Sequence, residues 1–433
     1  MSGGPFTVVA TGVGLVSAFG CGTEGLEAAL AEGATLLQEV ERPAGYHRDA
    51  PDSARRALLA GSVSLAEWLK PAEARRMSPP SKFAVAAARQ ALARAGLGPE
   101  SGLAQEPATA VVISTAFGPS SYTERLLEQV FREGPEAASP FLFTECVANA
   151  PAAQIAIVTG ARGANLTVVQ REAGPLAAFA RGAAEIASGR ARRALVGAVE
   201  EITPLVHSLL DRFGAISRGG ASGRAEDEAA RPFDRDRDGF LASEGAAVIV
   251  LEREEDALAR GARPLAKITA WSNAFDPTAT ATEWGTGAEG LARRLGKLLD
   301  RSGGVSSIDR IVSGASGSRR GDALEARTLR QVWSRSGLPL PPLLAPKAVA
   351  GEYAGCFLAA MLLAAEGLAF GPTAGFREAD PELGVIPYDG RALPRPRRLL
   401  ATSLAAGGAA CWVVLDAAPV AQQGETKSEG PTE

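Results

Sequence analysis

Short runs of apolar residues alternate with longer Ala- and Leu-rich stretches along most of the chain. The apolar runs are continuous, as in TAVVIST at Thr109–Thr115 and AAVIVL at Ala246–Leu251. Such runs are typical of strands buried on both faces, and strands that alternate with helices favour α/β architecture. The predicted strands are Phe6–Gly12, which runs into a turn, Thr109–Thr115, Asn165–Val169, Arg193–Val199, Ala246–Leu251, Leu265–Asn273, Arg310–Ser313, Leu399–Ser403 and Cys411–Leu415. The predicted helices are Thr23–Glu32, Lys82–Gly96, Pro151–Val158, Ala173–Ser188, Gly287–Arg301, Asp322–Trp333 and Ala354–Leu368.

The strand and helix pattern restarts near residue 256, which predicts two similar halves. We expect an N-terminal half over residues 1–255 and a C-terminal half over residues 256–416. The last residues, 417–433, read AAPVAQQGETKSEGPTE. This composition is polar and rich in Pro and Gly, so we predict a disordered tail.

Composition narrows the classes of function. Hydrophobic residues make up 46% of the 433 residues, enough for a large core. The 45 Lys and Arg residues nearly balance the 49 Asp and Glu residues, and a net charge of -4 gives no long-range attraction to nucleic acid or to an anionic membrane. No apolar run approaches the roughly 20 residues of a membrane span. We therefore expect neither nucleic acid nor a membrane as a partner.

The four cysteines lie far apart, at Cys21, Cys146, Cys356 and Cys411, and form no CxxC pair. This spacing indicates neither a disulfide framework nor a zinc cluster. The first residues, MSGGPFTVVATGVG, lack the charged and apolar regions of a signal peptide. We expect a reduced, cytoplasmic compartment, and predict neither a metal site nor a cofactor.

Two motifs have weak ligand interpretations. TGVGLVS at Thr11–Ser17 begins like a dinucleotide-binding GxGxxG motif, but Ser17 stands where the third glycine belongs, and a tight turn after a strand is favoured. The run PFDRDRDGFLASEG at Pro232–Gly245 begins like a calcium-binding EF-hand loop, but Gly245 stands where that loop needs an acidic residue. A charged loop that leads into the next strand is favoured.

The second of these runs also resembles the β-ketoacyl synthase signature PFDxxRDGFxxxEGA. Further segments resemble that family in the same order, from about Phe6 to Leu415. They are VVATGVGLVSAFG near the start, SPF at Ser139–Phe141, GAVEEITPL at residues 197–205 and LATSLAAGGAACWVVL at residues 400–415. The resemblance implies a thiolase-like five-layered αβαβα fold of two similar halves.

The family's active members carry an acyl chain on a cysteine at a helix N-terminus, where the helix dipole lowers the thiol pKa and backbone N–H groups bind the oxyanion. In this chain the segment QREAGP places Glu172 in the cysteine position. A carboxylate is a weak nucleophile towards a thioester, and the product would be a high-energy anhydride. The resemblance therefore marks Glu172 as a poor acyl carrier.

The family's two catalytic histidines are also replaced. Gly314 stands in the first position and Glu352 in the second, whereas the family's lysine is retained as Lys347, which we expect to pair with Glu325 or Glu352. His47 and His207 are the only histidines, and neither lies where it could substitute. The family's Gly-rich turn keeps two glycines in TSLAAGGAA at Thr402–Ala410 but loses its phenylalanine gate. All three catalytic groups are therefore missing.

This pattern of losses resembles the chain length factors, or ketosynthase β subunits, of type II polyketide synthases, although many of these have glutamine where this chain has Glu172. The resemblance implies a non-catalytic subunit that forms a heterodimer with an active ketosynthase and sets polyketide chain length. An acyl carrier protein would deliver substrate to the catalytic partner, and the growing polyketide chain would enter a channel between the subunits. Two alternatives stay open: a malonyl-carrier decarboxylase that primes the synthase, and a purely structural scaffold subunit.

The resemblance also assigns residues to two surfaces. The predicted strand at the heterodimer interface contains Asn165, Leu166, Thr167, Val168 and Val169. The predicted channel wall contains Phe117, Ser120, Thr123, Leu127 and Leu142, the last in a loop at Phe141–Thr144. If residues 120–132 form a helix, Ser120, Thr123 and Leu127 share one face. The alternative is that this face simply packs against the partner.

Overall fold

The computed structural model describes residues 4–43, 53–98 and 108–418. Within these residues, eleven strands form the main sheet in the order β12-β11-β14-β15-β10-β1-β9-β7-β5-β6, with β2 beside β1. The strands are β1 (Val8–Ser17), β2 (Gly20–Cys21), β5 (Thr109–Ser114), β6 (Asn165–Val168), β7 (Arg193–Glu200), β9 (Gly245–Arg253), β10 (Ala266–Phe275), β11 (Arg310–Val312), β12 (Leu343–Leu344), β14 (Arg398–Leu404) and β15 (Ala409–Ala417).

The sheet consists of two five-stranded blocks with the same topology. The first runs β1-β9-β7-β5-β6 and the second β10-β15-β14-β11-β12. In each block the first two pairings are antiparallel and the last two are parallel. The blocks join where Val8–Ala10 of β1 pairs antiparallel with β10. This repeated order is what two similar halves require, while the exact boundary near residue 255 stays a prediction.

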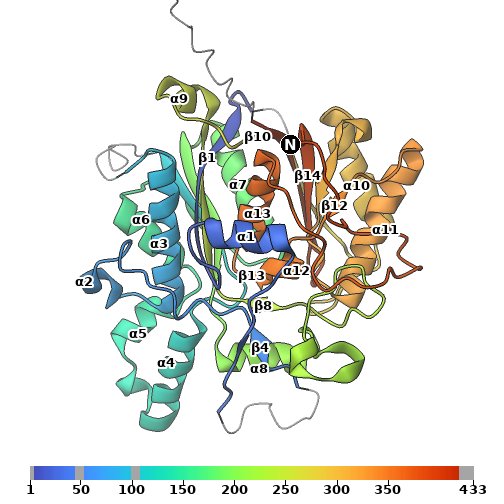
Figure 1. The fold of residues 1–433 in the computed structure, drawn as a ribbon. Coiled ribbons are helices and arrows are strands. Elements are labelled where there is room, and N and C mark those ends of the chain that lie inside the picture. Colours follow the sequence, from blue (N-terminus) through green and yellow to red (C-terminus); the bar gives the residue numbers. More distant parts are fainter. Residues whose placement is uncertain (1–3, 44–52, 99–107, 419–433) are drawn as a thin grey trace, which may run out of the picture.

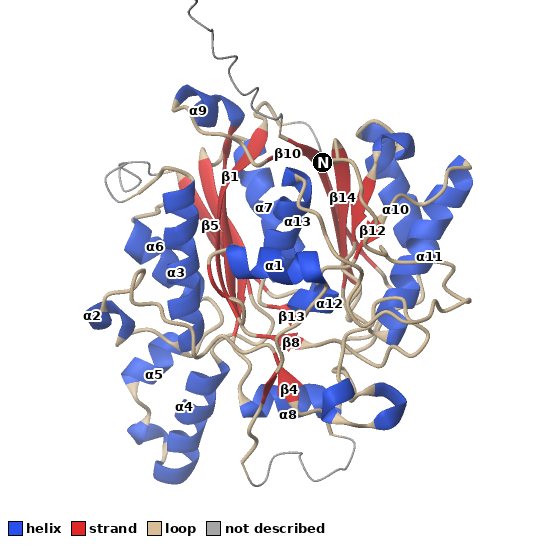
Figure 2. Ribbon diagram, viewed as in Figure 1, coloured by secondary structure: helices blue, strands red, loops and turns tan. Residues whose placement is uncertain are grey.

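Helices lie outside and between the two blocks (Figures 1 and 2). Helices α3 (Pro79–Arg94) and α6 (Ala150–Thr159) cover the outer face of the first block, and α10 (Ala288–Arg301) and α11 (Arg319–Ser336) cover that of the second. Helices α7 (Gly174–Ala187) and α13 (Cys356–Glu366) fill the space between, beside α1 (Glu24–Glu32). The expected α/β class and five-layered order are therefore confirmed.

The remaining elements lie outside these layers or connect them. They are α2 (Pro71–Ala74), α4 (Ser120–Glu133), α5 (Pro140–Glu145), α8 (Pro204–Arg212), α9 (Glu254–Ala259), α12 (Lys347–Ala350), β3 (Gln38–Glu39), β4 (Arg56–Ala57), β8 (Ala242–Ser243) and β13 (Glu352–Tyr353).

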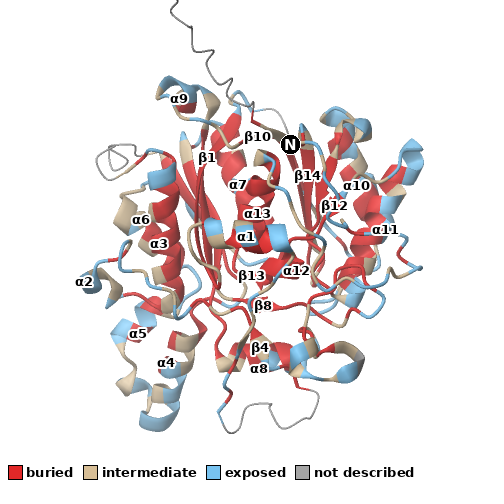
Figure 3. Cartoon of the chain, in the orientation of Figure 1, coloured by how far each residue is buried: buried red, intermediate tan, exposed pale blue. Residues whose placement is uncertain are grey.

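Each helical layer has its own hydrophobic core. The central core joins α7 and α13 to both blocks, one outer core lies under α3, and the other lies under α10 and α11. Figure 3 shows the consequence, because α7 and α13 are almost entirely buried whereas α4 is largely half-buried or exposed. The alanine-rich composition suits this arrangement, since small side chains let helices lie close to a sheet.

The first strand is longer than predicted. We expected it to end in a turn at Gly12, but β1 continues to Ser17. A Cβ atom on Gly12 would lie 2.2 Å from the carbonyl oxygen of Ala91, and one on Gly14 would lie 2.0 Å from that of Ala87. The two glycines therefore let α3 pack directly on β1, and the GxG pattern reflects packing rather than a nucleotide turn.

Three other expectations need correction or lie outside the described residues. The segment at Phe141–Thr144, expected as a loop, belongs to α5, whose Ser139 cap accepts a hydrogen bond from the Leu142 amide. The predicted tail begins too early, because Ala417 ends β15 and Ala418 is buried. Residues 419–433 and His47 lie outside the described residues.

Candidate functional site

Four segments far apart in sequence meet around Glu172, at the start of α7. Glu172 lies in a single turn of 3-10 helix, Arg171–Ala173, that leads into α7. The end of β14 with the turn that follows it, and the α12–β13 segment, bond to Glu172 directly. The segment from β11 to α11 packs against these two, through Gly314 at β14 and Ser316 at Glu352. Glu172 is 5% exposed. The positions that the sequence analysis assigned to the missing catalytic groups are therefore brought together in one buried centre.

The Glu172 carboxyl group is held by hydrogen bonds at both oxygens. Its Oε2 accepts from the backbone N–H of Ala406 at 3.2 Å, and its Oε1 accepts from the Tyr353 hydroxyl at 3.3 Å. Its main-chain oxygen accepts from the Ser403 hydroxyl at 2.7 Å. The inward N–H group of the Gly-rich turn is thus occupied by the chain's own side chain.

Burial, together with the negative charge of Glu352, raises the pKa of Glu172 to about 7. A substantial fraction of Glu172 is therefore protonated at neutral pH. Protonation removes the little nucleophilicity that a carboxylate has.

The preceding residue, Arg171, has a φ of 45°, an uncommon conformation for a residue other than glycine. Positive φ values at such a turn are typical of sites where the backbone is held in a special geometry.

Lys347 forms a buried ion pair with Glu352, one of the two partners expected. The Nζ–Oε1 distance is 2.5 Å, and the side chains are 1% and 0% exposed. Lys347 also donates to the main-chain oxygen of Glu172 at 3.4 Å. Glu325, the other expected partner, instead accepts hydrogen bonds from Ser313 and Thr402, both at 2.6 Å. Burial raises the pKa of Glu352, and the Lys347 ammonium opposes that rise.

The position of Gly314 has no room for an imidazole. A Cβ atom there would lie 2.6 Å from the carbonyl oxygen of Thr402 and 2.8 Å from the Cα atom of Ser403. Both are backbone atoms of β14, which cannot move aside without disturbing the sheet. The family's histidine is therefore absent here, and the backbone of β14 also leaves no space for its side chain.

Tyr353 is part of the centre although the sequence gave no sign of its role. It has a φ of 83° and packs edge-on against Phe117 and Phe240, with ring centroids 5.3 and 5.4 Å away. Burial holds the pKa of its hydroxyl well above the usual value. The phenol therefore stays protonated and can donate to Glu172. Only its position next to Glu352 could have drawn attention to it.

The predicted wall residues lie in different environments. Phe117 and Leu127 are 42% and 47% exposed. Ser120 is buried, with its hydroxyl directed at Glu201, and Thr123 donates to the carbonyl oxygens of Pro119 and Cys146. Leu142 is buried against Tyr122 and Leu126 in a small core between α4 and α5. Of the five predicted wall residues, Phe117 and Leu127 are the two whose side chains are exposed enough to face another molecule.

The predicted interface strand is at the open edge of the sheet. Among the residues that the structure describes, β6 pairs with β5 alone, and its own residues are exposed or half-buried. Val169, which follows the strand, is 58% exposed. Large apolar side chains are exposed on α4, α5, α6 and the segments that flank them; with Val169 they form what we call the apolar surface. Its members are Phe117, Leu127, Phe131, Phe141, Phe143, Val147, Ile157 and Val169.

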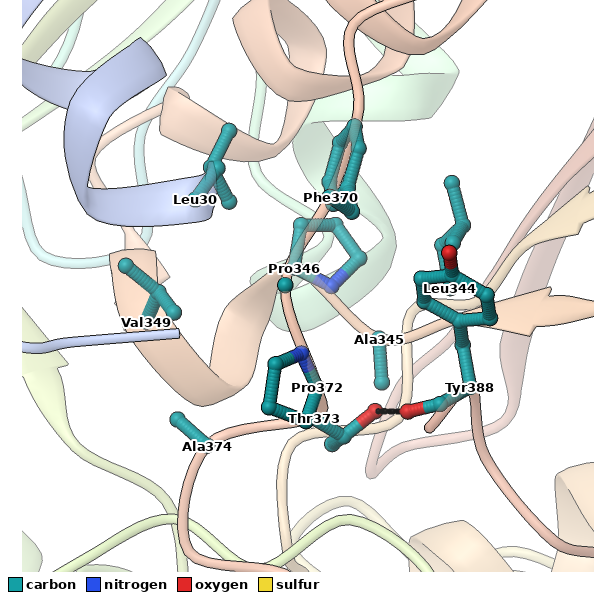
Figure 4. A pocket seen from close by; sticks show the side chains of 11 residues that line it. Leu30, Leu344, Ala345, Pro346, Val349, Phe370, Pro372, Thr373, Ala374 and Tyr388 are labelled. Atoms are coloured by element: carbon teal, nitrogen blue, oxygen red, sulfur yellow. Dashed lines mark hydrogen bonds between the residues drawn. The ribbon is translucent and has the colours of Figure 1, made fainter. Parts of the chain in front are cut away.

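Two hollows in the described part of the chain lie outside the buried centre. Figure 4 shows one of about 20 Å³, lined by Leu30, Pro346, Val349 and Tyr388, which has room for little more than one water molecule. A larger hollow of about 400 Å³ lies between α5 and α6, with Phe141 and Ile157 in its lining. This second hollow is therefore part of the apolar surface.

The aspartates of the calcium-like motif have structural roles. Asp234 accepts hydrogen bonds from the amides of Arg377 and Glu378, and Asp238 accepts from Ser217 and Gly220. Within residues 4–43, 53–98 and 108–418, no three His, Cys, Asp or Glu side chains gather where they could share a metal ion. Among the described helices, none combines the length and apolar character needed to cross a bilayer.

Comparison with known proteins gives consistent matches over most of the chain. Residues 6–257 match the family model described as beta-ketoacyl synthase, N-terminal domain. The chain is 32% identical to the 3-oxoacyl-(acyl-carrier-protein) synthase 2 of Rhizobium meliloti over 73% of its length and 76% of that protein. It is 30% identical to the tetracenomycin polyketide synthase ketoacyl synthase alpha subunit of Streptomyces glaucescens, over 87% of this chain and 88% of that protein. A solved structure of the ishigamide ketosynthase/chain length factor superposes with a TM-score of 0.82 at 28% identity, covering 96% of this chain and all of the other.

Proposed function

The chain belongs to the beta-ketoacyl synthase family, and from that premise we propose that it is a subunit that does not itself condense acyl groups. It pairs with a catalytically intact ketosynthase of a type II polyketide synthase and limits the length of the polyketide that the pair makes. An acyl carrier protein brings the substrate to the catalytic partner, and the growing chain extends towards this subunit.

The observation that carries the first part is the filled centre. The side chain where a thiolate must stand is a buried carboxyl group hydrogen-bonded to Ala406 and Tyr353. The position of the second imidazole holds a carboxylate paired with Lys347, and the position of the first has no space for a side chain. The same arrangement disfavours the malonyl decarboxylase alternative, because an enolate would meet carboxylates where it needs hydrogen-bond donors.

The open edge of the sheet supports a partner subunit. A bare edge strand invites pairing with another chain, and β6 has its unpaired side beside exposed apolar residues. Exposed apolar clusters of this kind mark interaction sites on soluble proteins. The similar solved structure is that of the ishigamide ketosynthase/chain length factor, which supports a ketosynthase as the partner here.

The position of Phe117 supports a role in chain length. Its ring contacts Tyr353 in the buried centre, yet 42% of the side chain is exposed on the apolar surface. An acyl chain that grows from the partner across this surface would meet Phe117 and Leu127 before it reached the filled centre. Each further buried methylene gains about 0.8 kcal/mol where there is room, whereas forcing it into filled space costs about 1–3 kcal/mol.

The test is reconstitution with the cognate, catalytically intact ketosynthase. We expect the two proteins to co-elute, this chain alone to form no carbon–carbon bond from malonyl and acyl carriers, and the pair to make one dominant product length. Steady condensation by the purified chain, or a pair that never forms although both proteins are folded, would refute the proposal.

A further inference from the structure

Glu200, the last residue of β7, and Glu201, which follows it, accept hydrogen bonds from the segment that begins the predicted channel wall. Glu200 is fully buried and accepts hydrogen bonds from the amides of Ala116, Phe117 and Gly118, at 2.5 to 3.3 Å, and from the Thr115 hydroxyl. One side chain thus binds three successive amides of the loop that carries Phe117. Its geometry leaves this loop little freedom to shift along the sheet.

Glu201, which is 3% exposed, accepts hydrogen bonds from the next residues of the chain, at the start of α4. It accepts from the amide of Ser121 at 2.7 Å, from the Ser121 hydroxyl at 2.9 Å and from the Ser120 hydroxyl at 3.3 Å. The N-cap residue of α4 is Pro119, whose side chain has no acceptor. Glu201 therefore supplies the acceptor for the Ser121 N–H group in the first turn of α4, where a helix has no backbone acceptor of its own.

These polar contacts matter because α4 and α5 share little hydrophobic packing. Their own core contains three buried residues, Tyr122, Leu126 and Leu142, and is separate from the three large cores of the protein. Figure 1 shows the two helices at the periphery, below α3. A buried amide that loses its only acceptor is costly, so each of these hydrogen bonds resists a shift of the loop or the helix. The direction in which α4 leaves the sheet therefore depends strongly on Glu200 and Glu201.

We propose that Glu200 and Glu201 are positioning residues that fix the wall formed by Phe117 and Leu127, and so set where chain growth stops, without touching the acyl chain. This inference rests on the proposed function. The Phe117 ring contacts Tyr353, which donates to Glu172. Contacts therefore run without a break from Glu200 through Phe117 and Tyr353 to Glu172 in the filled centre.

The experiment compares Glu201→Ala with Glu201→Gln in the reconstituted pair. Burial raises the pKa of Glu201 to about 7, so a neutral side chain of the same shape is a conservative replacement. We expect Glu201→Ala to raise the share of products one extension unit longer by about tenfold, the change that about 1.4 kcal/mol produces. We expect Glu201→Gln to restore the normal distribution. Ser121→Ala removes one of the hydroxyl donors and should shift the distribution in the same direction but less.

A matched control is Glu228→Ala. Glu228 is equally buried and accepts from the amides of Arg55 and Arg56, so its loss removes a similar carboxylate far from α4 in the sequence. We expect this variant to lose stability without changing product length. Hydrogen exchange gives a second readout: Glu201→Ala should speed exchange in residues 116–121, and Glu228→Ala should not.

The outcomes separate this inference from the proposed function. If Leu127→Ala lengthens the product but Glu201→Ala and Ser121→Ala leave both product length and exchange unchanged, the positioning role is wrong and the proposed function stands. An equal shift in Glu228→Ala would also overturn it, because the effect would then follow from general destabilisation. If no wall variant changes product length while pairing and activity survive, the proposed function itself fails.

Discussion

The buried centre around Glu172 and the apolar surface on α4, α5, α6 and β6 have opposite characters. The centre packs three carboxyl groups and one ammonium into space that solvent does not reach, with Glu172, Glu352, Glu325 and Lys347 all at most 5% exposed. The apolar surface instead exposes large side chains such as Phe131, at 81%, and Ile157, at 72%. Usual burial preferences are thus reversed in both regions.

The difference teaches where the protein can act. In the centre, the Ala406 amide and the Tyr353 hydroxyl already donate to Glu172, and Lys347 is paired with Glu352, so a substrate would have to displace the chain's own side chains. An exposed apolar surface lowers its free energy by association. The insertion that carries most of this surface, α4 to α6 between β5 and β6, has a much shorter counterpart in the second block, where α11 alone links β11 to β12. The repeated scaffold supports both blocks, and the added helices distinguish the first.

The largest expected effect is that condensation activity cannot be restored by putting catalytic residues back into the centre. We expect Glu172→Cys, alone or with Glu352→His, to give no condensation above background in the purified chain. The thiol would stand beside Gly314, where backbone atoms of β14 exclude a side chain, so the two-imidazole arrangement cannot form. Thioester formation and product release are measured by mass spectrometry, with an intact ketosynthase as the positive control. Turnover by either variant would show that the centre is less closed than its geometry indicates.

Removing the only ammonium of the centre comes next. Lys347→Met leaves Glu352 buried without its partner, and breaking a buried pair from one side costs about 3–5 kcal/mol. Chemical denaturation should show this loss, and the double variant Lys347→Met with Glu352→Gln should recover much of it. An unchanged unfolding midpoint in the single variant would mean that water reaches the pair.

The pH dependence of stability sharpens the picture of Glu172. Because its pKa is raised to about 7 in the folded chain, the folded state keeps a proton that the unfolded state releases above about pH 4.3. Its contribution is therefore greatest below that pH and is lost as pH rises through 7. Glu172→Gln has no proton to lose, so its stability relative to the wild type should increase by about 3 kcal/mol between pH 4 and pH 8. Parallel denaturation curves at each pH measure this, and a constant difference would contradict it.

A charge placed on the apolar surface tests the other side of the comparison. Val169→Asp should weaken pairing with the ketosynthase about a hundredfold, since an unpaired carboxylate would be buried beside β6. Leu258→Asp is the matched control, because Leu258 is 57% exposed on α9, at the opposite end of the molecule from α4 and α5. Affinity is measured by surface plasmon resonance or titration calorimetry. Equal affinities for both variants would place the interface elsewhere.

The sequence predicted much of the scaffold and little of the site's geometry. Continuous apolar runs located β5, β7 and β9 within one or two residues, because a strand buried on both faces leaves a strong signal. The position of Glu172 followed from its resemblance to a family motif. Tyr353 could not be found in this way, since its positive φ and its contacts depend on distant segments.

The α4–α5 region shows the same limit. A helical face through Ser120 and Leu127 was predicted correctly, but which end of it is buried depends on Glu201, which comes from another strand. Leu142 was expected to face a channel, and the small core between α4 and α5 encloses it instead. Periodicity shows which residues share a face, whereas the partner of that face is set by tertiary packing.

The most direct test of the account is the mass of the products made by the reconstituted pair when the surface is enlarged. Leu127→Ala and Phe117→Ala should keep pairing and activity but shift the dominant product longer by one or two extension units, whereas Leu258→Ala should leave it unchanged. Each added methylene would then gain about 0.8 kcal/mol in the space created. Active, correctly paired complexes that give the wild-type length in both surface variants would contradict the claim that this subunit sets chain length.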